Sequence, residues 1–190
     1  MRITSGEFGG RLLKVPKTGD VRPTQDRVRE ALFSMLQTHL AGADFLDLFA
    51  GTGSVGLEAI SRGAKSATFV EINPKHLAIL GENAKMASGK AAAVKTVRMD
   101  AVKFVANYSG GGFDIVFADP PYLMGETMGY GEMLQNLMSR NVVKPGGLFI
   151  AEMTSAQAAD RSSGWELVRE RTYGKTRLAI WKRDEGENEK

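Results

Sequence analysis

Short apolar runs alternate with amphipathic stretches along most of this chain. Runs rich in Val, Ile, Phe and Ala favour buried strands, and apolar residues spaced three and four apart favour helices. This alternation predicts a parallel sheet with helices on both faces, closed by an antiparallel hairpin. The predicted strands span residues 45–49, 66–71, 94–99, 113–118, 148–153, 165–172 and 176–182. The predicted helices span residues 24–40, 54–62, 74–87, 101–108 and 131–140.

The two ends of the chain differ from this alternating region. Residues 1–23 carry glycines and prolines between short apolar stretches, which predicts a hairpin or an extended arm. Residues 24–183 form the predicted α/β domain, and the polar residues 184–190 form a tail that we expect to be disordered. A chain of 190 residues is long enough for one such domain with a small extension.

Composition narrows the classes of protein that fit. The chain has no cysteine, which excludes disulfides, cysteine metal sites and a cysteine nucleophile. No apolar run approaches about 18 residues, and the N-terminus lacks the core of a signal peptide, so we expect a cytoplasmic protein without a membrane partner. His39 and His76 are the two histidines, and neither lies near a motif. We therefore expect both on helix surfaces, and no metal site.

Positive charge is concentrated near the N-terminus. Residues 1–29 contain seven basic and three acidic residues, a net charge of +4, whereas the remaining chain has 18 basic and 19 acidic residues. An excess of this kind suits a segment that binds phosphate groups. We expect the N-terminal segment to contact nucleic acid; a solvated basic surface is the simpler alternative.

A glycine-rich turn follows the first predicted strand of the sheet. Gly51, Gly53 and Gly56 match the G-x-G-x-x-G pattern of dinucleotide-binding proteins. Asp47 lies at the strand end just before them, where a carboxylate suits a cationic amino-acid ligand better than a pyrophosphate. The position of Asp47 therefore argues against a nicotinamide cofactor, although the glycines match the pattern.

Three more acidic residues end predicted strands, namely Glu71, Asp100 and Asp119. Each taken singly is more often a surface or capping residue, but four acids at four successive strand ends are not a common coincidence. Ligands of open α/β sheets bind outside the carboxyl ends of the strands. In Asp119-Pro120-Pro121-Tyr122 the prolines make the turn rigid. A fixed carboxylate and carbonyl beside an aromatic ring can receive a planar aromatic amine.

The N-terminal arginine block and the two motifs together resemble a known family. The matching segments are Arg2-Ile3-x-Ser5-Gly6, Gly10-Arg11, Arg22-Pro23-Thr24-x-Asp26-Arg27-Val28-Arg29-Glu30, Phe49-Ala50-Gly51-Thr52-Gly53, Gly56-Leu57-Glu58-Ala59, Ser61-Arg62-Gly63-Ala64 and Asp119-Pro120-Pro121-Tyr122. The chain resembles class I S-adenosylmethionine-dependent methyltransferases and, more narrowly and almost from end to end, the RsmD-type 16S rRNA (guanine(966)-N2)-methyltransferases. It departs from the family pattern at Leu123–Gly129, which is rich in glycine and methionine here.

The resemblance implies a Rossmann-like sheet of seven strands and a set of site residues. The catalytic group would be Asp119, Pro120 and Tyr122. The cofactor-binding group would be Asp47, Gly51, Gly53, Glu71, Asp100 and Ala101. The residues in contact with RNA would be Arg11, Arg22, Thr24, Arg27 and Arg29, together with Tyr122. The cofactor would be S-adenosylmethionine, with S-adenosylhomocysteine as product and no metal. The substrate would be 16S ribosomal RNA within a small-subunit particle, and the enzyme a monomer.

Other functions use parts of the same pattern. A DNA or RNA adenine-N6 methyltransferase would use the same Asp-Pro-Pro-Tyr chemistry, although a DNA enzyme needs additional mass to recognise sequence. A protein glutamine N5-methyltransferase would be expected to carry Asn in place of Asp119. An RNA-binding module without activity would not need four acids at successive strand ends.

Overall fold

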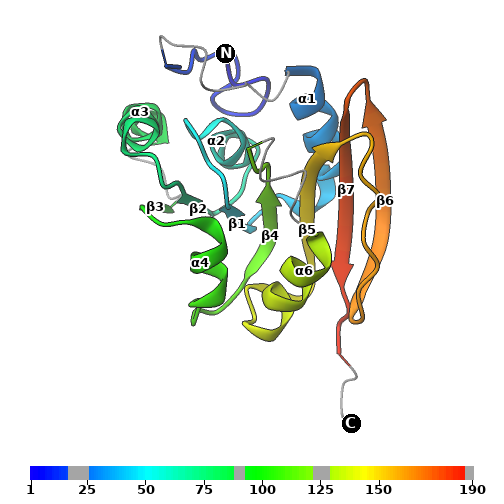
Figure 1. Cartoon of the computed structure of the whole chain (residues 1–190). Coiled ribbons are helices and arrows are strands. Elements are labelled where there is room, and N and C mark those ends of the chain that lie inside the picture. The colour runs from blue at the N-terminus through cyan, green and yellow to red at the C-terminus, as the bar shows by residue number, and fades with distance from the viewer. Residues whose placement is uncertain (17–25, 88–92, 122–128, 187–190) are drawn as a thin grey trace. The chain divides into compact units, whose positions relative to one another are not determined.

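The computed structural model of the chain describes residues 1–16, 26–87, 93–121 and 129–186. The chain divides into two compact units, Met1–Ala101 and Val102–Lys190, which we call unit 1 and unit 2 (Figure 1). The predicted boundaries of the arm, the α/β domain and the tail do not coincide with the boundary between these two units, and they stay predictions. Among the described residues, no helix combines the length and the apolar character needed to cross a membrane.

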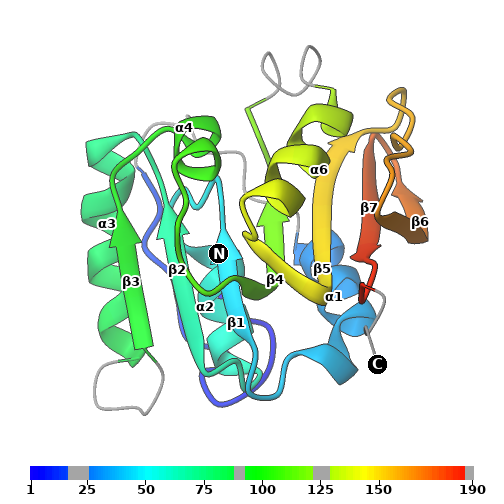
Figure 2. The ribbon, with the colours of Figure 1, turned by 90° about the horizontal axis from the view of Figure 1, so that it is seen from below.

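Unit 1 is built on three parallel strands. In chain order its elements are α1 (Asp26–Met35), η1 (Gln37–His39), β1 (Asp44–Asp47), α2 (Ser54–Ser61), β2 (Ser66–Val70), α3 (Pro74–Ala84), η2 (Lys85–Ala87) and β3 (Ala93–Val97). The strand β2 pairs with β1 on one side and with β3 on the other. Both α2 and α3 lie on the same face of these strands (Figure 1 and Figure 2).

The turns into these helices have local causes. Asn73 caps α3, because its side-chain oxygen accepts a hydrogen bond from the Lys75 amide at 2.9 Å and Pro74 takes the first helical position. Before α2, Gly53 has a φ of 85°, a left-handed conformation that glycine adopts without strain. Gly56 lets α2 lie directly on β2, because a Cβ at this position would be 2.3 Å from the Phe69 ring.

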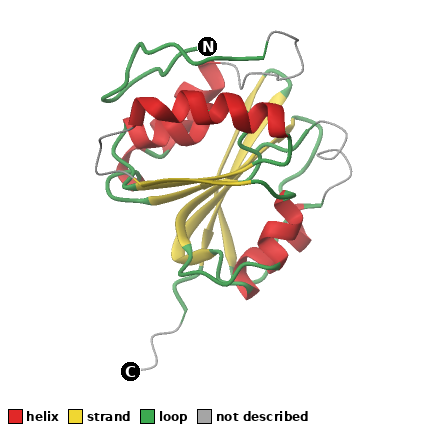
Figure 3. Cartoon of the chain, turned by 90° about the vertical axis from the view of Figure 1, so that its left-hand side faces the viewer, coloured by secondary structure: helices red, strands yellow, loops and turns green. Residues whose placement is uncertain are grey.

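The N-terminal segment, residues 1–16, packs on α2 and α3 of the same unit (Figure 3). An antiparallel bridge between Arg2 and Leu12 closes it into a hairpin-like loop. The Phe8 amide donates to the Ser61 hydroxyl at 2.9 Å, and the Lys14 amide donates to the Asn83 side chain at 2.8 Å. The segment is therefore docked through its backbone as well as through buried apolar side chains.

Unit 2 combines two parallel strands with an antiparallel hairpin. Its elements are α4 (Ala101–Ala106), which begins at the last residue of unit 1, and then β4 (Phe113–Ala118), α6 (Tyr130–Ser139), β5 (Val143–Thr154), β6 (Trp165–Tyr173) and β7 (Thr176–Arg183). The strand β5 is parallel to β4, and β7 runs antiparallel to both β5 and β6. The helix α6 packs on this sheet through Tyr130, whose ring centroid lies 6.1 Å from those of Phe149 and Trp181.

The predicted fold class is confirmed. Seven strands lie within the described residues, in the order β3-β2-β1-β4-β5-β7-β6, with the antiparallel hairpin at the end of the chain. The strand predicted at 113–118 has those bounds in the structure. Two elements differ most from the prediction. The helix predicted to run to residue 40 ends at Met35 and is followed by the short η1, and β5 begins at Val143 and not at residue 148. Gly146 and Gly147 break the apolar pattern there, and the pairing of Phe113 with Val143 extends the strand nonetheless.

Candidate active site

The acidic residues of unit 1 lie at one edge of its sheet. Asp47 is the last residue of β1, Glu71 follows β2 directly, and Asp100 follows β3 by three residues. The pairing registers align these ends, since Asp47 pairs with Phe69 and Val70 pairs with Val97. The structure thus brings together three carboxylates that the sequence separates by up to about fifty residues.

Asp47 is buried beneath the glycine turn. It is 1% exposed, and its Oδ2 accepts a hydrogen bond from the Gly56 amide at 3.2 Å. Gly51 has a φ of 52°, and a Cβ built there would meet open space. The turn therefore bends over Asp47 and leaves room beside Gly51, where a side chain would otherwise stand. This combination of a buried carboxyl group and an open backbone fits the amino-acid part of a ligand.

Glu71 joins the glycine turn to the start of α3. One carboxylate oxygen accepts from the Gly51 amide at 2.8 Å, and the other accepts from the Asn73 amide at 2.7 Å. A carboxylate has about four lone-pair positions, so two hydroxyl donors can be added to these bonds. The side chain is 11% exposed, which leaves it within reach of a ligand. These features fit the two hydroxyls of a ribose.

His76 lies beside this carboxylate and was not expected there. Its Nδ1 is 3.7 Å from Oε2 of Glu71, and its side chain is 17% exposed. Sequence reasoning placed His76 on a helix surface away from the motifs. The position could have been recognised, because the first turn of a helix that follows a strand faces the carboxyl ends of the sheet.

Two exposed apolar side chains flank the same edge. Ile72 is 60% exposed and follows Glu71, and Met99 is 39% exposed and precedes Asp100. Each lies two residues beyond the paired positions Val70 and Val97, so both extend the sheet edge at the same level. Exposed apolar groups at this level suit a flat aromatic ring, which the acids alone would not hold. Sequence reasoning did not single out either residue.

The Asp-Pro-Pro-Tyr motif belongs to unit 2, where it follows β4. Asp119 is half-buried and Pro120 is buried, while Tyr122 falls outside the described residues. Glu152 lies on the neighbouring strand, one residue beyond the pairing of Ala118 with Ala151, and is buried. A second carboxylate therefore lies next to the strand end that carries Asp119, and it was not predicted.

Tyr130 supports this end of unit 2. Its hydroxyl donates to the Glu152 carbonyl at 3.1 Å. Burial, and after it the negative charge of Asp119, raises the pKa of Tyr130 above the ordinary value for a tyrosine. The ring therefore keeps its proton, and its hydroxyl stays a hydrogen-bond donor, in the field of the Asp119 carboxylate.

The predicted RNA-contacting residues have different environments. Arg11 and Arg27 are exposed, and Arg11 lies 5.1 Å above the Phe8 ring. Arg29 is 0% exposed; it forms ion pairs with Asp26 at 2.9 Å and with the buried Glu58 at 3.7 Å, and it donates to the Arg2 carbonyl. This burial argues against direct contact between Arg29 and RNA. Arg22 and Thr24 lie outside the described residues.

Comparison with known proteins shows which class and family of proteins the chain belongs to. The sheet, the glycine turn and the acids at the strand ends define a class, the S-adenosylmethionine-dependent methyltransferases with a Rossmann-like fold. The family model described as Conserved hypothetical protein 95 matches residues 1–182, and the chain belongs to this family.

Named relatives share nearly the full length. Ribosomal RNA small subunit methyltransferase D of Escherichia coli K12 is 34% identical over 195 residues, which cover 100% of this chain and 93% of the relative. A putative rRNA methyltransferase, YlbH, of Bacillus subtilis is 32% identical, with 96% and 99% covered. The solved structure of the putative methyltransferase yhhF from Escherichia coli has a TM-score of 0.84 and 32% identity, with 97% and 98% covered.

Proposed function

We propose that this protein transfers a methyl group from S-adenosylmethionine to the exocyclic N2 of a guanine in 16S ribosomal RNA. The observation that carries the proposal is the pair of hydrogen bonds that the Glu71 carboxylate accepts from the Gly51 and Asn73 amides, in a chain that belongs to this family. The full-length similarity to a small-subunit rRNA methyltransferase supports the RNA substrate. We expect the substrate to be a small-subunit particle and the enzyme to act as a monomer.

The residues of unit 1 would hold the cofactor. Asp47 and the backbone at Gly51 and Gly53 would bind the methionine part, whose ammonium group needs an anion nearby. Glu71 would accept hydrogen bonds from the ribose hydroxyls. Asp100 and the backbone of Ala101 would bind the adenine edge. The exposed Ile72 and Met99 would lie against the adenine ring, and they are added here to the predicted cofactor-binding residues. When bound, S-adenosylmethionine supplies an electrophilic methyl group on a sulfonium sulfur.

The residues of unit 2 would act on the guanine. An exocyclic amine is a poor nucleophile because its lone pair is delocalised into the ring. Hydrogen bonds from the amine to the Asp119 carboxylate and the Pro120 carbonyl would orient that lone pair. They would also stabilise the positive charge that develops on nitrogen, and the Asp119 carboxylate would accept the departing proton. Tyr122 would stack on the extruded base.

One experiment tests this function directly. The protein and labelled S-adenosylmethionine are incubated with small subunits in one reaction and with protein-free 16S rRNA in another. Both substrates come from cells that lack the gene. The RNA is then digested, and the labelled nucleoside is identified. The proposal requires label in N2-methylguanosine; label in N6-methyladenosine instead would overturn it. Label in subunits but not in free rRNA would support a particle as the substrate.

A further inference from the structure

A second concentration of positive charge lies on unit 2, along the edge strand β6 and the turn to β7. Residues 161–177 contain five basic and two acidic residues, a net charge of +3. The net charge of residues 30–190 taken together does not show this excess, because acidic residues elsewhere in that range offset it. We call Arg161, Arg169, Arg171 and Lys175 the basic edge.

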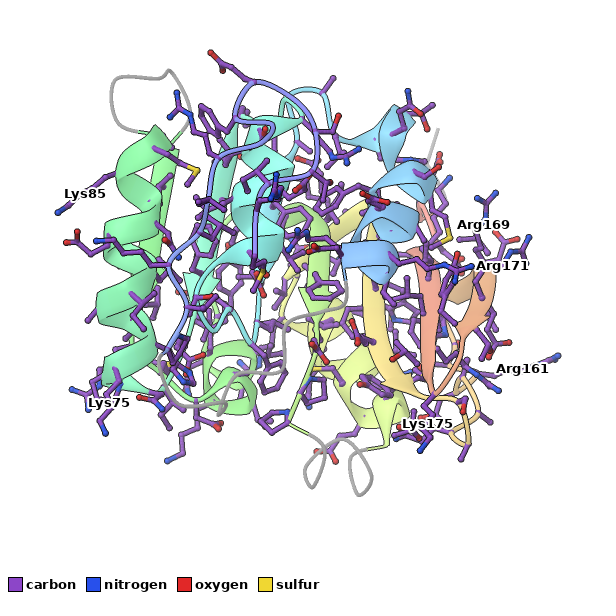
Figure 4. The ribbon with its side chains drawn as sticks, turned by 90° about the horizontal axis from the view of Figure 1, so that it is seen from above. Lys75, Lys85, Arg161, Arg169, Arg171 and Lys175 are labelled. Atoms are coloured by element: carbon purple, nitrogen blue, oxygen red, sulfur yellow. The ribbon has the colours of Figure 1, made fainter. Side chains whose placement is uncertain are left out.

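All four residues of the basic edge are exposed. Figure 4 shows Arg161, Arg169 and Arg171 along the outer side of the strands, directed away from them. Arg169 and Arg171 share one face of β6, because they pair with Ile180 and Leu178 of β7. Alternate residues of a strand are roughly 6.7 Å apart, which is comparable with the separation of successive phosphates along an RNA strand.

The positive charge of the basic edge is not neutralised within the described chain. Glu170, the acid between its two strand arginines, pairs with Arg177 at 2.7 Å instead. Arg171 donates to the Glu170 carbonyl, and among the described residues none of the four cations forms an ion pair with a carboxylate. The half-buried ring of Tyr173 follows Arg171 on the same face. Exposed guanidinium groups next to an aromatic ring are typical of surfaces that bind nucleic acid.

The strand itself is poorly suited to pairing with another strand. The register of β6 on β7 shifts between Leu167 and Arg169, and this irregularity lies on the outer strand of the sheet. Irregular pairing together with exposed charge is how edge strands avoid edge-to-edge association. The partner that fits the basic edge is therefore an anionic backbone and not a protein strand.

We propose that the basic edge binds the phosphate backbone of the RNA substrate, as a set of contacts separate from the N-terminal segment. The inference rests on the proposed RNA substrate. Its contacts would be with phosphates and not with bases, so they would add affinity and orientation without reading sequence. Unit 2 would then hold the RNA strand that carries the target guanine through this edge as well as through Asp119 and Tyr122.

The test uses the double variant Arg169→Gln/Arg171→Gln, with small subunits from cells lacking the gene as substrate. We expect KM for subunits to rise about tenfold at near-physiological salt, while kcat stays unchanged. We expect the slope of log KM against log salt to fall by about 1.4, since each phosphate contact contributes about 0.7. Arg169→Lys/Arg171→Lys keeps the charge and should retain most of the slope.

A matched control removes the same charge elsewhere. Lys65 and Lys85 are exposed residues of unit 1, each paired with a surface carboxylate. Lys65→Gln/Lys85→Gln should leave KM and its salt dependence near those of the unmodified protein. Thermal unfolding and cofactor affinity should be unchanged in all three variants, because the substituted side chains are exposed.

The outcomes separate the two proposals. If the unmodified protein methylates neither subunits nor 16S rRNA, the proposed function fails. If it methylates them, and the Arg169→Gln/Arg171→Gln variant has an unchanged KM and salt slope, the basic edge is not an RNA contact. Equal losses in the Lys65→Gln/Lys85→Gln control would reduce the effect to net charge and overturn the inference. So would a dimer, detected by light scattering, that this arginine variant dissociates.

Discussion

The carboxylate of Glu71 accepts a hydrogen bond from the backbone amide of Gly51 at 2.8 Å, although Gly51 lies in the turn after β1 and Glu71 follows β2. This bond fixes the position of the glycine turn relative to the end of β2. The same carboxylate holds the Asn73 amide at the start of α3. The residue proposed to bind the ribose is thus also the residue that orders the turn proposed to bind the methionine part.

Replacing Glu71 should weaken cofactor binding. In Glu71→Ala the two ribose hydroxyls lose a charged acceptor, which is worth about 1.5–3 kcal/mol. Isothermal calorimetry with S-adenosylmethionine measures the change. Asp44→Asn is the control, because Asp44 lies at the opposite end of β1 and bonds Ser66 and Lys65. Unchanged affinity in Glu71→Ala would remove Glu71 from the ribose site.

Replacing Asp119 should slow the chemical step and spare cofactor binding. Asp119→Ala removes the acceptor that orients the amine, so we expect a single-turnover rate lower by two orders of magnitude or more, the scale for loss of one preorganised charge-stabilising group. Asp114→Asn changes an acid of the same strand that pairs with Lys144, and it should leave the rate unchanged. An Asp119→Ala enzyme of normal rate would refute the catalytic role.

The contribution of Tyr122 to activity should depend on its ring and not on its hydroxyl. Stacking on a base needs only an aromatic face, so Tyr122→Phe should keep most of the activity. Tyr122→Ala should lose about 1–3 kcal/mol of base-stacking energy, seen in kcat/KM. If Phe were as damaging as Ala, the hydroxyl would carry the role, and stacking would be the wrong explanation.

Arg29 and Arg11 should affect different properties. Arg29 pairs with Glu58 where both side chains are 0% exposed, so Arg29→Ala should lower the free energy of unfolding by about 3 kcal/mol. Arg11 is exposed, so Arg11→Ala should leave stability nearly unchanged and reduce the salt dependence of RNA binding. Chemical denaturation and RNA binding at several salt concentrations check both. A stable Arg29→Ala protein with weakened RNA binding would reverse the assignment.

Gly56 should resist substitution although it lies in a helix. A Cβ there would be 2.3 Å from the Phe69 ring, so Gly56→Ala should cost about 1–3 kcal/mol of stability through overpacking. Gly81, in α3, is the matched control, because a Cβ there would meet nothing within 4 Å. Gly81→Ala should be neutral or stabilising by about 0.5–1 kcal/mol, since alanine favours helix. Equal effects at both positions, measured by urea denaturation, would contradict the packing argument.

Much of the fold followed from periodicity alone. The run Phe113–Ala118 is buried and β-rich, and it is a strand with those bounds. Asn73 and Pro74 begin α3 because capping depends on neighbours within one helical turn. Asp47, Glu71 and Asp100 meet at one edge because parallel strands bring their carboxyl ends together. These features depend on local sequence and on the rule that parallel strands align.

The tertiary structure decided which charged side chains face solvent. Arg29 lies in an arginine-rich block whose sequence resembles a nucleic-acid contact, but Glu58, which lies far along the chain, pairs with it in the interior. His76 reaches Glu71 because α3 starts at the end of β2. Arg169 and Arg171 form a basic edge because strand pairing places them on one face of β6. The net charge summed over residues 30–190 does not show this, because it includes acidic residues that lie elsewhere. Sequence determined the elements and their order, because those depend on near neighbours; partners distant in sequence are selected by packing, which only the folded chain contains.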